Sequence, residues 1–97
     1  MKSKRIENRV LIDELKEKHS CIICGNKEVD IHHIKTKKSG GDDVPYNLVP
    51  LCRVHHSSLH SMGIKKFAKE YILFEAFLLY FGWELNALNK WVYNNKE

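Results

Sequence analysis

The residues best suited to metal chemistry gather in one part of this chain. All three cysteines and five of the six histidines of its 97 residues lie between Cys21 and His60. The cysteines form a Cys21-x-x-Cys24 pair, and Cys52 is followed three residues later by His55. Thiolates and imidazoles at such spacings are typical zinc ligands. The segment holds enough ligands for two metal sites.

The cysteines predict a structural zinc site. Four ligands of the Cys3His kind, Cys21, Cys24, Cys52 and His55, complete the closed tetrahedral site that structural zinc prefers. A redox-active dithiol has the same Cys-x-x-Cys spacing, but this interpretation leaves Cys52 and the histidines without a role. Three ordinary reduced thiols are the remaining alternative, which the paired spacing disfavours. A zinc ion would also compensate for the small core of a short chain.

The remaining histidines predict a second metal site. If the segment from Leu51 to about His60 is helical, Cys52 and His55 share one face of the helix. His56 and His60, four residues apart, then share a neighbouring face. Two imidazoles at this spacing on a helix can clamp a divalent ion. The helix would therefore contribute to two separate sites.

A pair of adjacent histidines can complete the second site. His32 and His33 lie in the stretch 29–34, whose β-branched residues predict a strand. Successive side chains of a strand point to opposite faces, so the two histidines cannot perform the same task. One can bind the ion while its neighbour acts on a water molecule.

Together these motifs resemble those of the HNH endonucleases. The similar residues are Asp30-x-His32-His33-Ile34, Gly40-Gly41, Asn47-Leu48, Leu51-Cys52 and His55-His56. The resemblance covers roughly residues 21–61 and is strongest to small zinc-stapled members from phages and prophages. It implies an α+β fold with a ββα-metal core, and hydrolysis of phosphodiester bonds in DNA. Many members close the zinc site with a second Cys-x-x-Cys, whereas here His55 takes the place of the last cysteine.

The resemblance also implies a role for individual residues. His33 would be the general base that takes a proton from the attacking water, and Asn47 would orient its ring through hydrogen bonds. Asp30 would not bind the ion itself but would lie next to the residues that do. His60 would be a further ligand or a phosphate contact. The ligands of the catalytic ion would be His32, His56 and His60.

The ligand types bear on the choice of ion. Neutral imidazoles suit Mn2+, Ni2+, Co2+ or Zn2+ better than Mg2+, although the resemblance keeps Mg2+ open. The implied cofactors are a structural Zn2+ and a catalytic Mg2+, Mn2+, Ni2+ or Zn2+ ion. The catalytic ion would act as a Lewis acid on the scissile phosphate and the leaving oxygen.

The charge of the chain suits a polyanionic partner. The formal net charge is +4 and the sequence pI is about 9.0. Lys35, Lys37 and Lys38 follow the histidine pair and are predicted to contact DNA phosphates, as is Arg53 in the expected helix. A solvated basic loop is the alternative interpretation of the lysines.

Regular structure is also expected on either side of the core. The chain is predicted to be a single domain over 1–97, with an amphipathic N-terminal helix over about 4–18 and the ββα core over about 20–61. Two C-terminal helices, interrupted at Gly82, are expected within about 64–94.

The apolar run Tyr71–Phe81 bears on assembly. It is too short to cross a bilayer, so no membrane association is expected. It is predicted to pack on the core, with a homodimer through the C-terminal helices as the rival. The charged N-terminus and reduced cysteines predict a cytoplasmic protein, and the resemblance suggests phage or prophage origin.

Two functions remain as candidates. The first is a metal-dependent HNH endonuclease. The second is a noncatalytic zinc-stabilised module that binds nucleic acid or a protein partner. The joint presence of His33 and Asn47 favours the nuclease, because a structural module needs neither a base nor a residue to orient it.

Overall fold

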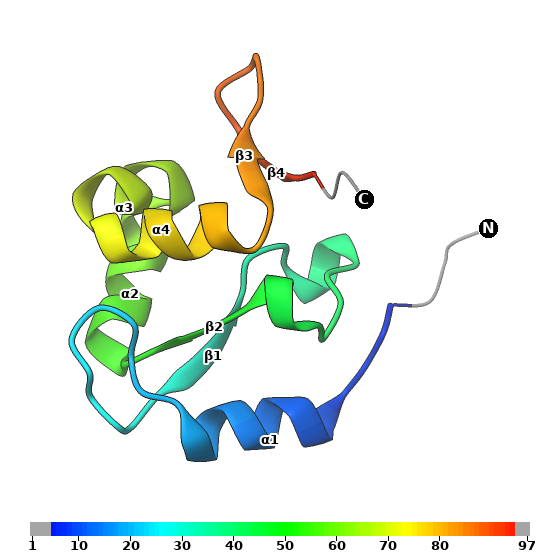
Figure 1. Ribbon diagram of the computed structural model, residues 1–97, viewed down its shortest axis with the longest axis vertical. Helices are drawn as coiled ribbons and strands as arrows, with labels where there is room; N and C mark the ends of the chain where they lie inside the picture. The colour runs from blue at the N-terminus through cyan, green and yellow to red at the C-terminus, as the bar shows by residue number, and fades with distance from the viewer. Residues whose placement is uncertain (1–4, 95–97) are drawn as a thin grey trace.

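The computed structural model describes residues 5–94, which form a small α+β fold (Figure 1). Within this range there are four helices and two two-stranded antiparallel sheets. The helices are α1 (Arg9–Lys18), α2 (Arg53–Met62), α3 (Ile64–Glu70) and α4 (Ile72–Tyr80). The strands are β1 (Asp30–His33), β2 (Leu48–Leu51), β3 (Trp83–Leu85) and β4 (Trp91–Tyr93).

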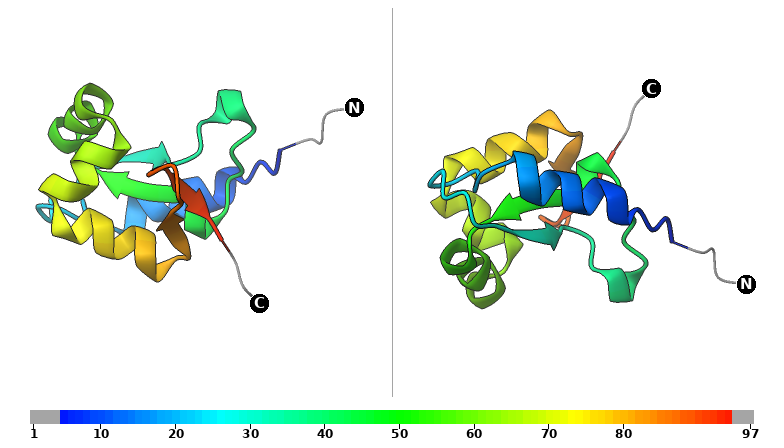
Figure 2. Two further views of the ribbon diagram at one scale, coloured as in Figure 1. Left: turned by 90° about the horizontal axis from the view of Figure 1, so that it is seen from above. Right: turned by 90° about the horizontal axis from the view of Figure 1, so that it is seen from below.

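The first sheet, β1 and β2, lies at the centre of the molecule. Strand β1 pairs with β2 so that Asp30 lies opposite Leu51 and His33 lies opposite Leu48. All four residues of β2 are buried, and α1 and α4 lie on opposite sides of the pair (Figures 1 and 2). Helix α2 follows β2 almost directly. The predictions of a strand at the histidine pair and of a helix towards His60 are confirmed.

Helix α1 begins later than predicted. Its first turn is capped by Asn8, whose Oδ1 accepts a hydrogen bond from the backbone N–H of Leu11 at 3.0 Å. Such a cap satisfies a backbone donor that has no partner inside the helix. Residues 5–8, before the first turn, are not helical, and residue 4, where the predicted helix begins, lies outside the described residues. The predicted end, Lys18, is confirmed.

The predicted C-terminal helix that precedes Gly82 forms two helices, α3 and α4, instead of one. The helical conformation is interrupted at Tyr71, which has an extended backbone. The rings of Phe67 and Phe74, both fully buried, contact each other edge to face with centroids 5.0 Å apart. An unbroken helix would separate these positions by about 10.5 Å along its axis. The break therefore lets both rings enter the same core.

The prediction of a second C-terminal helix is wrong, because the segment forms the β3–β4 hairpin. Trp83 pairs with Tyr93, and Leu85 pairs with Trp91. Large aromatic residues favour paired strands. The turn is shaped by asparagine: Asn89 adopts a positive φ of 65°, which this residue type tolerates well.

The hairpin packs against the turn that precedes β2. The indole Nε1 of Trp83 donates a hydrogen bond to the backbone oxygen of Tyr46 at 2.6 Å. The rings of Tyr46 and Tyr93 stack, with centroids 3.7 Å apart and planes 6° from parallel. These contacts anchor the hairpin beside Asn47 and explain why tertiary packing prevails over the helical period of its apolar residues.

The apolar residues of α4 divide between the core and the surface. Leu78 is fully buried, whereas Leu79 is 56% exposed and Ile72 is 75% exposed. Leu85 and Leu88, both exposed, lie on the hairpin. Pairing of two chains through this region stays a prediction. None of the helices in the described part of the chain has the length and apolar character that a membrane crossing requires.

Adjacent leucines of α4 give a direct test of its orientation. We expect Leu78→Ala to reduce the free energy of unfolding by about 2–5 kcal/mol, because it leaves a cavity in the core. The matched variant Leu79→Ala should change it by less than about 1 kcal/mol. Urea denaturation followed by circular dichroism measures both. Equal losses would contradict the orientation of the helix.

Candidate metal and catalytic site

The three cysteines and one histidine meet at the start of α2. The ligand atoms of Cys21, Cys24, Cys52 and His55 all lie within 4.8 Å of one another. The first two come from the loop after α1, Cys52 is the residue before α2, and His55 lies in its first turn. All three cysteines are free thiols. The structure therefore brings together every residue that the sequence predicts for the zinc site.

The spacing of these atoms suits a zinc ion. Tetrahedral zinc places neighbouring sulfur and nitrogen ligands roughly 3.5–3.8 Å apart, given the usual bond lengths. The Sγ atoms of Cys24 and Cys52 are 3.7 Å apart, and Nδ1 of His55 is 3.8 Å from Sγ of Cys21 and 3.2 Å from Sγ of Cys52. The two sulfurs are far beyond disulfide distance. The cluster can hold zinc with small adjustments.

The surroundings of Cys21 favour its thiolate form, which is the form that binds zinc. Burial raises the pKa of this thiol, but backbone hydrogen bonds at Cys52, Cys24 and Ile23 outweigh burial and lower the pKa below its usual value. The protein therefore supplies fixed donors to a buried sulfur that would otherwise resist ionisation.

A second cluster is formed by His32, His56 and His60. Nε2 of His56 lies 3.2 Å from Nδ1 of His32 and 3.1 Å from Nε2 of His60. An ion bound by imidazole nitrogens holds adjacent ligand atoms roughly 2.8–3.4 Å apart for octahedral to tetrahedral angles. The three nitrogens therefore suit one divalent ion. Each residue predicted as a ligand of the catalytic ion is present in the cluster.

The proton states of two of these ligands follow from their surroundings. Burial, followed by the neighbouring charges of His56, His60 and His33, lowers the pKa of His32 to about 3. Its ring is therefore neutral, as metal binding requires. Oδ2 of Asp30 lies 3.3 Å from Nδ1 of His56, so Nδ1 can donate and leave Nε2 free for an ion. Asp30 thus lies behind a ligand, where the resemblance puts it.

His33 is not part of the histidine cluster, and its ring contacts an acidic residue instead. Its Nε2 lies 2.7 Å from Oδ1 of Asp43, in a contact where the His33 side chain is 10% exposed and that of Asp43 is 4% exposed. The alternation of β1 explains why His32 and His33 differ in their partners. Both nevertheless line the same cleft of about 330 Å3, together with His56 and His60.

Asp43 is held as a carboxylate. Burial raises its pKa, but hydrogen bonds from His33, from the backbone N–H of Asn8 and from Arg5 outweigh burial and lower the pKa to about 2. Arg5 Nη1 lies 3.0 Å from Oδ1, and Asn8 N lies 2.8 Å from Oδ2. The carboxylate is therefore ionised across the physiological range of pH.

Asn47 does not contact His33, which corrects the expectation that its amide holds the ring. Its Oδ1 accepts from the backbone N–H of Lys35 at 2.7 Å. Its Nδ2 donates to the backbone oxygens of Lys35 at 3.1 Å and Asp42 at 3.0 Å. Through these bonds the amide of Asn47 connects the two ends of the loop that follows β1. Among residues 5–94, the ring of His33 is bonded by Asp43 instead.

The glycine pair closes this loop. The backbone of Gly41 donates to the oxygen of Thr36 at 2.8 Å. A Cβ added to Gly41 would lie 1.8 Å from the backbone oxygen of Lys35, so no other residue fits without moving the chain. The preceding Gly40 has a φ of +88°, which glycine adopts without strain. The loop therefore returns tightly enough to bring Asp43 to His33.

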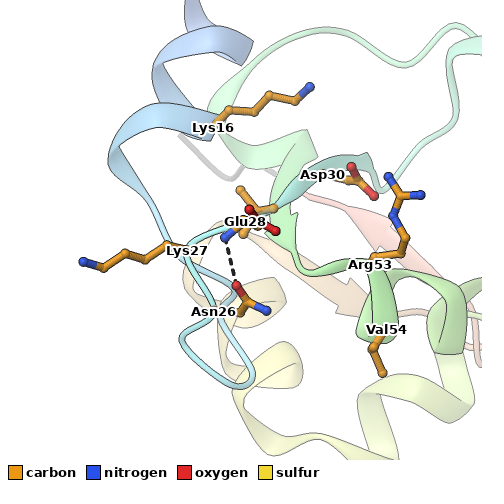
Figure 3. A pocket seen from close by; sticks show the side chains of 8 residues that line it. Lys16, Asn26, Lys27, Glu28, Asp30, Arg53 and Val54 are labelled. Carbon is orange, nitrogen blue, oxygen red and sulfur yellow. Dashed lines mark hydrogen bonds between the residues drawn. The ribbon is translucent and has the colours of Figure 1, made fainter.

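Two of the predicted DNA contacts lie at the histidine cleft and two do not. Lys37 and Lys38 line the cleft. Lys35 lines a different pocket, beside Trp83 and Trp91. Arg53 lies in a third pocket of about 440 Å3 with other charged residues. Figure 3 shows Lys16, Asn26, Lys27, Glu28, Asp30 and Arg53 around this third pocket.

Sequence reasoning missed Asp43 and its partners at the N-terminal end. Asp43 carries no local signal, because its partner His33 lies ten residues away and the loop must close before they meet. Arg5 and Asn8 are still further away in the sequence. The only signal is a pair of acidic residues, Asp42 and Asp43, after a glycine pair, which by itself indicates a polar turn.

Comparison with known proteins gives one match. The family model described as "Putative HNHc nuclease" matches residues 4–90. Comparisons with curated proteins and with solved structures find no match. The matched region includes both clusters, the loop between β1 and β2, and the helices of the C-terminal third.

The role of the cysteine cluster can be tested by removing one sulfur. We expect Cys52→Ser to lose about one equivalent of zinc and at least ~3 kcal/mol of stability, because binding energy at such a site is folding energy. For a domain of this size that loss lowers the melting temperature by roughly 12–24 °C. Elemental analysis and thermal denaturation measure the two effects. The control is His19→Gln, an exposed histidine outside both clusters, and unchanged zinc in Cys52→Ser would contradict the assignment.

Proposed function

The chain belongs to the HNHc nuclease family, and from this premise we propose that it is a metal-dependent endonuclease that hydrolyses phosphodiester bonds in DNA. The observation that carries the proposal is the convergence of His32, His56 and His60 on the cleft that also contains His33. In this proposal β1, β2 and α2 form the ββα-metal core, with the cysteine cluster holding a structural Zn2+ beside it.

His32, His56 and His60 would hold the catalytic ion. When bound, a divalent ion supplies Lewis-acid stabilisation of the scissile phosphate and of the leaving oxygen. Asp30 fixes the orientation of His56 by accepting from its Nδ1. Three neutral imidazoles favour Mn2+, Ni2+ or Zn2+ over Mg2+.

His33 would act as the general base. His33 lines the same cleft as the ligand cluster but is not a member of that cluster, so its imidazole can accept a proton instead of binding the ion. In the reaction the water oxygen bonds to phosphorus as its proton passes to the imidazole. The bond between phosphorus and the 3′-oxygen then breaks, and the 3′-oxygen leaves with the bonding electron pair and takes up a proton from solvent to become a hydroxyl group. Asn47 would act indirectly, by holding the loop that carries Asp43.

Lys37 and Lys38 would bind the phosphates of the substrate. Both line the histidine cleft, and both lie in the short turn Lys37–Ser39 after β1. Ammonium groups at this position attract the phosphates of a DNA backbone whatever the base sequence. We therefore propose that they help to hold a DNA strand across the ligand cluster. A contribution from Lys35 and Arg53 would involve DNA beyond the cleft itself.

The proposal is tested by plasmid cleavage. We expect the native protein to nick supercoiled DNA when Mn2+, Ni2+ or Mg2+ is added, and His33→Ala to lose about 10^2 to 10^4 in rate, because its general base is gone. His33→Ala should keep its zinc and its fold. Agarose electrophoresis gives the rate, and elemental analysis and circular dichroism give the other two quantities.

His19→Ala is the matched control for this experiment. It removes an exposed histidine outside both clusters and should cleave at the native rate. Nicking by His33→Ala within tenfold of native would remove His33 from the mechanism. A native protein that binds DNA but does not cleave it with any of these ions would favour the noncatalytic zinc module.

A further inference from the structure

Asp43 is a buried charge that neither the ligand clusters nor the phosphate contacts use. Its two oxygens receive three hydrogen bonds. Oδ1 accepts from Nε2 of His33 at 2.7 Å and from Nη1 of Arg5 at 3.0 Å, while Oδ2 accepts from the backbone N–H of Asn8 at 2.8 Å. A buried carboxylate is costly unless it is fully bonded. Three donors from distant parts of the chain therefore mark a position built to hold a negative charge.

We propose that Asp43 is the positioning residue of the general base, which it holds with the proton on Nε2 and with Nδ1 free to accept the proton of the attacking water. The chemical part of this inference rests on the proposed nuclease function. The positional part rests on the 2.7 Å contact and on the burial of both side chains.

The choice of nitrogen follows from hydrogen-bonding capacity. An ionised carboxylate can only accept hydrogen bonds, so the ring nitrogen that faces it must carry a hydrogen. In a neutral imidazole the other nitrogen then has a lone pair. Because His33 lines the cleft, that lone pair is the proton acceptor available to a water bound there. The low pKa of Asp43, about 2, supports its ionised state.

The segment before α1 keeps Asp43 in place. Residues 5–8 run along the loop 41–43 (Figure 2, right), where Asp43 donates its backbone N–H to the oxygen of Ile6 at 2.8 Å. Ile6 donates its own N–H to Oδ1 of Asp42 at 2.6 Å, and Arg5 donates to the oxygen of Gly41 at 3.0 Å. Residues 5–8, called the strap below, are thus connected to His33 through the carboxylate of Asp43.

The decisive variant is Asp43→Asn. Its amide can donate to Nε2 as readily as its oxygen can accept, so the ring of His33 is no longer held in one tautomer. We expect kcat to fall by at least about 10-fold and by no more than the roughly 10^2 to 10^4 that removal of the base itself would cost. KM should stay within about twofold, because the lining of the cleft does not include Asp43.

A second readout does not depend on turnover. Nitrogen-15 NMR distinguishes the two tautomers of a neutral imidazole, and the signal of His33 is identified by its absence from His33→Ala. We expect the Nε2–H form in the native protein and a shift towards the Nδ1–H form in Asp43→Asn. A purely structural role for Asp43 would not move this signal while the fold is intact.

The matched control is Asp42→Asn, which makes the same chemical change one residue earlier. The Asp42 carboxylate bonds the strap at Ile6 but not His33. We expect its kcat within about twofold of native and an unchanged NMR signal. An equal loss of kcat in both variants would overturn the proposal, because the strap as a whole would then be responsible.

The remaining outcomes also decide the question. The Nδ1–H form in the native protein would overturn the proposal even if Asp43→Asn failed to fold. Unchanged kcat and tautomer in a folded Asp43→Asn would overturn it as well. If the native protein cleaves no DNA, the nuclease function fails, whereas the native tautomer and its shift in Asp43→Asn still decide whether Asp43 holds the ring.

Discussion

The structure depends on one short helix that serves two ligand clusters from adjacent positions. His55 and His56 are neighbours in α2, so their side chains leave the helix about 100° apart. His55 joins the cysteines, while His56 joins His32 and His60. A zinc ion shared with the loop cysteines would hold the start of α2 and so fix the rotation of the helix about its own axis. The second cluster can therefore form only with the helix in this orientation.

The other end of the site is fixed by loop closure rather than by ligands. Asn47 bonds both ends of the loop after β1, and Gly41 lets the loop approach the strand closely. Asp43 then reaches His33, which is not a member of the ligand cluster. The proposed base and the proposed metal ligands are thus held by separate parts of the chain. In this arrangement the ring of the base can be oriented without disturbing the ligands beside it.

Much of the site can be predicted from local residue spacing. The rest depends on closure of the loop after β1, which brings together residues that are distant in the sequence. The division of Cys52 and His55 from His56 and His60 follows from helical geometry, and the opposite partners of His32 and His33 follow from strand alternation. The Asp43 contact and the true partners of Asn47 require a closed loop, which no spacing reveals. The segment of the C-terminal hairpin also fits a helical period, because Leu85, Leu88 and Val92 follow one another at three to four residues. Pairing of Trp83 with Tyr93, and the asparagine turn, decide its structure.

The central claim is that α2 contributes to two metal sites with different tasks, a closed structural site and an open catalytic one. Dialysis of the native protein against a mild chelator tests it most directly, with metal content, circular dichroism and plasmid cleavage measured before and after. The account predicts that one zinc per chain and the fold persist, while cleavage is lost and returns when Mn2+ or Ni2+ is added. Loss of cleavage only together with the zinc and the fold would contradict it, as would a native protein without zinc.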